Sequence, residues 1–168
     1  MKDTQTSSAC ESISSPLQSQ TNAPRRILVV EDDTVTRQIS IQILIRSGYA
    51  VDAAEDGAAG WQALNTDRYD LLVTDNKMPK VSGVELLKKL RAARMLLPVI
   101  MVTGTLPNEE FTRSPWIRPT ATLLKPYTVE EFLITVKEVL RATNRVCEPD
   151  TPPPNWQSQE SAEGMQAG

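Results

Sequence analysis

Acidic, hydroxyl and ammonium side chains follow several short apolar runs of this chain. Glu31 and Asp32 follow the first run, Asp75 the third, Thr103 the fourth and Lys125 the fifth. Carboxylates gathered at one point raise each other's pKa by repulsion, and a bound divalent cation relieves that repulsion. Carboxylate oxygens supplemented by water suit Mg²⁺, so we predict a Mg²⁺ site at the three acids.

The remaining residues indicate what such a metal site would act on. Lys125 offers a positive charge and Thr103 a hydroxyl donor, and groups of these kinds hold phosphoryl oxygens. The carboxylate of Asp75 can attack phosphorus as a nucleophile. The set therefore predicts transfer of a phosphoryl group to Asp75.

Each of these residues alone also has an ordinary structural explanation. Acids favour the positive end of a helix dipole, and an Asp after a strand often caps a turn or a helix. A threonine suits a buried strand, and Lys-Pro is typical of a loop. Only their combination, in this order at the ends of successive apolar runs, indicates a site.

Five apolar runs must position these residues, at 27–30, 50–53, 71–74, 99–102 and 121–124. Four of the five are nearly continuous rather than alternating, which is typical of parallel strands buried on both faces. In an open parallel sheet, ligands bind beyond the carboxyl ends of the strands. The residues that follow these runs are therefore expected at the edge of the sheet where a ligand would bind. Glu55 and Asp56 are expected farther out, in a loop.

Helix-length segments separate the runs. Helical spacing and capping signals predict helices over 34–47, 57–65, 82–94 and 128–143. Ser82 with Glu85 and Thr128 with Glu131 have the spacing of capping boxes. Pro115 follows the segment 106–114 and ends any helix there, so only a short or irregular helix is expected in it. Alternating strands and helices predict an α/β fold with a doubly wound five-stranded parallel sheet.

Composition excludes several classes of function. The 168 residues carry a net charge of −3 and include no histidine, which excludes Ser-His and Cys-His catalysis and His-ligated metal sites. We expect no direct binding of nucleic acid and no membrane span. Cys10 and Cys147 do not have metal-site spacing, and together with the absence of a signal peptide they favour a cytoplasmic location.

Composition also divides the chain into three parts. Residues 1–24 are mostly polar, and residues 146–168 are acidic and Pro-rich, so both are predicted to be disordered tails. Residues 25–145 form the one predicted domain.

Four stretches of that domain resemble the receiver domain of two-component response regulators. They are "RILVVEDDTVTR", "YDLLVTDNKMPKVSGVELLKKLR", "LPVIMVTG" and "LLKPYTVEEF". The resemblance covers 25–145 and implies a flavodoxin-like fold with strand order 2-1-3-4-5.

The resemblance also implies roles for single residues. Asp75 matches the phosphoacceptor, Glu31 and Asp32 the acidic pair, and Asp32 the more direct metal ligand. Lys77 stands where a main-chain carbonyl completes the metal's ligand shell. Thr103 matches the switch hydroxyl and Lys125 the lysine of the site. Asp33 falls outside the acid pair and is expected at the start of the first helix.

The implied partners are proteins. A histidine kinase or a phosphotransfer protein would supply the phosphoryl group, and an output protein not named by the sequence would receive the signal. The only activity expected of the chain is its own phosphorylation and dephosphorylation.

Two alternatives stand beside a phosphorylated receiver. The family's aromatic switch position is Thr122 here, which is compatible with a degenerate receiver acting as a constitutive scaffold. An aspartate-nucleophile phosphatase would need a second Asp two residues after Asp75, where this chain has Lys77. Without the switch aromatic, we expect the response to lie in the loop after Thr103, with Trp116 at its end.

Overall fold

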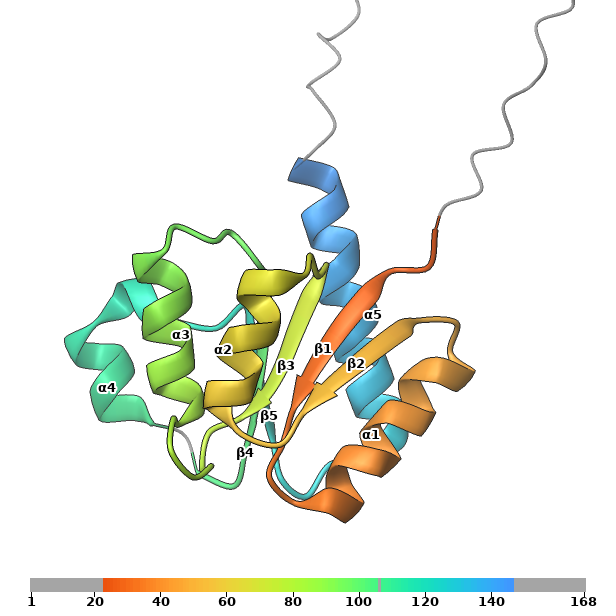
Figure 1. The fold of residues 1–168 in the computed structure, drawn as a ribbon, viewed down its shortest axis with the longest axis horizontal. Coiled ribbons are helices and arrows are strands. Elements are labelled where there is room, and N and C mark those ends of the chain that lie inside the picture. Colours follow the sequence, from red (N-terminus) through yellow and green to blue (C-terminus); the bar gives the residue numbers. More distant parts are fainter. Residues whose placement is uncertain (1–22, 106, 147–168) are drawn as a thin grey trace, which may run out of the picture.

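The fold was analysed in a computed structural model that describes residues 23–105 and 107–146. Five parallel strands form one sheet in the order β2-β1-β3-β4-β5 (Figure 1). The strands are β1 (Arg26–Val30), β2 (Ala50–Ala54), β3 (Leu71–Asp75), β4 (Val99–Thr103) and β5 (Ala121–Leu124). This confirms the predicted fold class and strand order. The predicted tails lie outside the described residues, apart from 23, 24 and 146.

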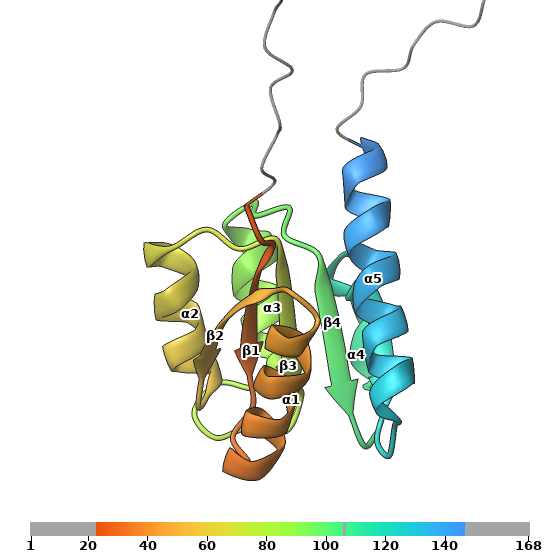
Figure 2. The same ribbon diagram turned by 90° about the vertical axis from the view of Figure 1, so that its right-hand side faces the viewer.

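Helices cover both faces of the sheet (Figures 1 and 2). They are α1 (Thr34–Arg46), α2 (Gly57–Thr66), α3 (Gly83–Ala92), α4 (Asn108–Arg113) and α5 (Val129–Val146), with a 3₁₀ turn, η1, at Pro115–Ile117. α1 and α5 lie on one face, and α2 and α3 on the other. One apolar cluster fills each interface, and Leu28 and Leu72 contribute to one while Ile27 and Leu71 contribute to the other.

The predicted helix starts are present with their capping hydrogen bonds. The Ser82 main-chain N–H donates to Glu85 Oε2 at 2.8 Å, and the Glu85 N–H donates to Ser82 Oγ at 3.2 Å. Thr128 and Glu131 form the same reciprocal pair. Asp33 caps α1 by accepting from the Thr36 N–H at 2.7 Å, as expected. These caps fix the first residue of each helix, and with it the end of the loop that leads from the preceding strand.

Burial along the strands differs from the prediction at one edge of the sheet. β3 and β4 are buried throughout, but β5 alternates, and Thr122 and Leu124 face solvent. The reason is the position of α4 and η1, because η1 packs against α3 rather than over β5. Phe111 and Ile117 are accordingly buried with the side chains of α3. The expected short helix is confirmed.

The face that α1 presents to the core is not the one with the most apolar residues. Ser40 and Leu44 are buried, although Ser40 is polar. Val35 and Ile39, which have helical spacing, are 65% and 52% exposed. α1 therefore carries apolar side chains on its solvent side.

None of the helices within residues 23–105 and 107–146 is long and apolar enough to cross a membrane.

Candidate phosphoryl-transfer site

The three predicted acids meet at the carboxyl edge of the sheet. One carboxylate oxygen from each of Glu31, Asp32 and Asp75 lies within 4.8 Å of the other two. The register explains this, because Val30 of β1 pairs with Thr74 of β3, and Glu31 follows Val30 as Asp75 follows Thr74. The convergence predicted from strand ends is confirmed.

The acids differ in their exposure to water. Glu31 and Asp75 are 5% and 8% exposed, whereas Asp32 is exposed at the rim of the site. Burial raises the pKa of Glu31, and the charge of Asp75 adds to this effect, while Lys125 opposes it. The site therefore holds negative charge that costs free energy in the absence of a cation.

Lys125 bridges the two buried acids. Its Nζ lies 3.0 Å from Glu31 Oε2 and 3.3 Å from Asp75 Oδ2. Burial alone would lower the pKa of the Lys125 ammonium, but hydrogen bonds and charge from Glu31 and Asp75 prevail and raise it. The contact with Glu31 is the shorter of the two.

Thr103 lies fully buried at the end of β4. Its Oγ1 donates to the Thr105 carbonyl at 2.9 Å and accepts from the Thr105 N–H at 3.3 Å. The hydroxyl is thus bonded to its own loop. Asp75 Oδ1 accepts from the Asn76 N–H at 2.6 Å, so the carboxylate is oriented from the β3–α3 loop.

That loop carries Lys77, which is exposed two residues after Asp75. The loop returns closely to the strand end, because the Gly83 N–H donates to the Asn76 carbonyl at 3.1 Å. A Cβ added at Gly83 would lie 2.2 Å from the Asp75 carbonyl oxygen, so glycine is needed for this approach. Lys77 is therefore held in a compact loop beside the acids.

Two polar interactions in the loops at the carboxyl edge of the sheet were missed by sequence reasoning. The Arg37 guanidinium donates to the carbonyls of Glu31 and Asp32 at 2.6 and 3.2 Å, which fixes the loop of the acid pair. Asp56, expected in an outer loop, is instead buried and paired with Lys80. An arginine in the first turns of a helix and an acid–lysine pair far apart in sequence give no local signal.

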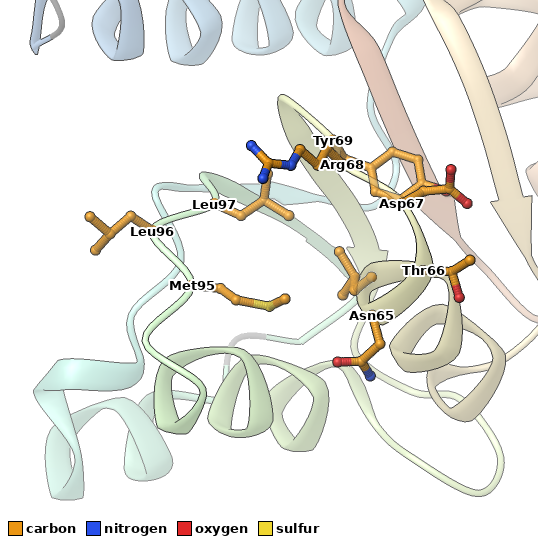
Figure 3. Close-up of a pocket in the computed structure, with 9 residues that line it drawn as sticks. Asn65, Thr66, Asp67, Arg68, Tyr69, Met95, Leu96 and Leu97 are labelled. Atoms are coloured by element: carbon orange, nitrogen blue, oxygen red, sulfur yellow. The ribbon is translucent and has the colours of Figure 1, made fainter.

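A pocket of about 540 Å³ lies away from this site. It is lined by the end of α2, the following loop and the α3–β4 loop, including Leu64, Tyr69, Met95 and Leu97 (Figure 3). These loops lie at the amino ends of the strands. The pocket therefore holds none of the residues predicted to handle phosphate.

A parallel sheet in this order, with an acid triad and a lysine at its carboxyl edge, is the architecture of a receiver domain. Residues 27–137 match the response regulator receiver domain family, and the chain belongs to it.

Two curated relatives are similar over most of the chain. The response regulator MprA of Mycobacterium sp. (strain KMS) is 33% identical over 129 residues, covering 77% of this chain and 56% of that protein. The probable transcriptional regulatory protein SilR of Salmonella typhimurium is 32% identical over 119 residues, covering 71% of this chain and 52% of that protein. The chain thus spans about half the length of the curated relatives it matches.

Solved structures show the same fold. A CheY-like receiver domain protein from Methanospirillum hungatei has a TM-score of 0.69 and 32% identity, covering 73% of this chain and 98% of that one. The response regulator TrrA of Thermotoga maritima, solved in complex with Mg²⁺-BeF, has a TM-score of 0.61 and 28% identity. That comparison covers 68% of this chain and 98% of that one.

Proposed function

We propose that this receiver domain accepts a phosphoryl group on Asp75 with the help of Mg²⁺ and signals through protein contacts. The observation that carries the proposal is the convergence of Glu31, Asp32 and Asp75 within 4.8 Å, with Lys125 bridging the two buried acids. An intact acid set of this kind favours a phosphorylated receiver over a constitutive scaffold.

The donor set fits Mg²⁺. Its atoms are carboxylate oxygens, and three acids face one lysine, so a divalent cation balances the remaining charge. Asp32 and Asp75 would bind the metal directly, Glu31 through water, and Lys77 through its main-chain carbonyl. When bound, Mg²⁺ offsets charge on the phosphoryl oxygens.

The chain's own residues would carry out the transfer. A carboxylate oxygen of Asp75 forms a bond to phosphorus as the bond from phosphorus to the donor breaks, which leaves an acyl phosphate and the free donor. Lys125 would move from Glu31 toward the phosphoryl oxygens. The Thr103 hydroxyl, now bonded to Thr105, would rotate to donate to one of them.

The phosphoryl group would come from a histidine kinase or a phosphotransfer protein, since the chain has no histidine of its own. Such a donor must dock around the mouth of the site. α1 begins directly after the acid pair and exposes Val35 and Ile39, one turn apart. These apolar side chains beside the acids support docking of a protein donor rather than turnover of external substrates. We infer a cytoplasmic location for this exchange.

The test is intact-mass analysis after incubation with a small acyl phosphate donor and Mg²⁺. We expect the wild-type chain to gain one phosphoryl group, and Asp75→Asn to gain none. Asp52→Asn is the matched control, because Asp52 lies in β2 and pairs with Arg26, away from the acids. Equal modification of wild type and Asp75→Asn would overturn the assignment.

A further inference from the structure

Lys80 and Asp56 form an ion pair that joins the β3–α3 loop to the start of α2. Lys80 Nζ lies 2.5 Å from Asp56 Oδ2, and the Asp56 side chain is 3% exposed while that of Lys80 is 65% exposed. The other oxygen of Asp56 accepts from the Ala59 N–H at 2.8 Å and caps α2. A buried carboxylate with both oxygens bonded is a rigid anchor for the lysine.

Lys80 occupies a backbone conformation that does not favour lysine. Its φ is 65°, in the left-handed region, which glycine and asparagine adopt at less cost. The position therefore retains a long cationic side chain where the backbone alone would favour glycine or asparagine. The side chain's contact with Asp56 provides a compensating interaction.

The loop that carries Lys80 is held by two close contacts of its last residues. A Cβ added at Gly57 would lie 2.2 Å from the Val81 carbonyl oxygen, so the start of α2 touches the loop next to the ion pair. Gly83, two residues after Val81, contacts the main chain of Asp75, so the end of the loop also lies against the end of β3. Lys77, whose carbonyl is the proposed metal ligand, lies earlier in the same loop.

We propose that Lys80 is a positioning residue for the metal site. By pairing with Asp56, it fixes the β3–α3 loop against the start of α2 and so holds the Lys77 carbonyl toward the acids. This inference rests on the proposed function of the site. It means that Mg²⁺ binding depends not only on the acids but also on the positive charge of Lys80, three residues after the proposed carbonyl ligand.

The test compares Mg²⁺ affinity with stability in Lys80→Asn. Asparagine tolerates the left-handed backbone but removes the ion pair with Asp56. Relief of backbone strain and loss of the pair oppose each other, so the denaturation midpoint measured without Mg²⁺ should change little. Mg²⁺ affinity by titration calorimetry should fall roughly 10-fold, within the range seen when groups that orient metal ligands are lost. Lys80→Arg, which can still reach Asp56, should retain affinity.

Controls separate positioning from charge. Lys88→Asn removes the same charge from an exposed site on α3 and should leave Mg²⁺ affinity unchanged. The double variant Asp56→Asn/Lys80→Asn should bind Mg²⁺ no more weakly than Lys80→Asn, because both act through one pair.

Equal Mg²⁺ affinity in Lys80→Asn and wild type would overturn the inference while leaving the proposed function intact. Loss of affinity accompanied by a large fall in the denaturation midpoint would also overturn it, since Lys80 would then act through the fold. A wild-type protein that binds no Mg²⁺ would overturn the metal site and this inference together.

Discussion

Lys125 Nζ lies closer to Glu31 Oε2, at 3.0 Å, than to the carboxylate of Asp75, at 3.3 Å. The lysine thus balances both buried acids before any phosphoryl group arrives. If Asp75 is phosphorylated as proposed, the added oxygens would compete for the ammonium, and release of Lys125 from Glu31 would be part of the response.

Lys125→Ala should lower stability and separate phosphorylation from response. It leaves two buried carboxylates without their cation, which we expect to cost about 1–3 kcal/mol given the partial exposure of the pair. Urea unfolding without Mg²⁺ measures this, with the exposed Lys137→Ala as control. The variant should still accept some phosphoryl group but lack the wild-type amide shifts. A phosphorylated variant with wild-type shifts would show that Lys125 has no part in the response.

Glu31 gives the apo protein a defined pH dependence. Its pKa is raised above 4.5 by burial, so the folded state binds this proton more tightly than the unfolded state does. Stability is therefore lost as pH rises from about 4.5 through the raised pKa. Glu31→Gln should be more stable than wild type near neutral pH, and its free energy of unfolding should vary less with pH across that range. Unfolding curves at several pH values check this, and a variant less stable than wild type at neutral pH would contradict it.

Asp32→Asn should separate fold from metal binding. Removing one of three clustered charges relieves repulsion, so the apo fold should be as stable as wild type or more stable. Mg²⁺ affinity should fall by 10-fold or more, on the order expected for loss of a charged ligand. Titration calorimetry and urea unfolding measure the two effects on one sample. Unchanged Mg²⁺ affinity would remove Asp32 from the ligand set.

Trp116 should report the response of the loop that follows Thr103. Thr103 is bonded to Thr105 in this structure, and its rotation toward Asp75 would pull on the segment that ends at Trp116. Trp116 is 60% exposed, so a change in its surroundings alters emission. Beryllofluoride with Mg²⁺ should shift the spectrum of a variant lacking Trp61 and Trp156. An unchanged spectrum, with Asp75 shown to be occupied, would place the response elsewhere.

The sequence was sufficient to predict the strand ends and therefore the meeting of the acids. Parallel strands end at one edge, so residues after successive apolar runs converge without knowledge of any side-chain contact. Capping boxes at Ser82 and Thr128 were predictable for the same reason, because their partners lie only three residues away.

Contacts between distant segments were not predictable. Lys80 reaches Asp56 across 24 residues, and no periodicity or motif marks that pair. The exposure of Thr122 and Leu124 depends on where η1 packs, which the prolines alone do not determine. In α1, the polar Ser40 is buried while Val35 and Ile39 are exposed, which hydrophobic spacing does not reveal.

The bridging position of Lys125 has a kinetic consequence. It lies 94 residues from Glu31 and 50 from Asp75 along the chain, so the site is closed by some of the most distant contacts in the domain. Contacts of high sequence separation form late and slowly, because loop-closure entropy must be overcome first. A nascent chain that has exposed Asp75 but not yet β5 lacks the lysine, and its acids remain unbalanced. In the proposed mechanism, the site would therefore be complete only once β5 has joined the sheet.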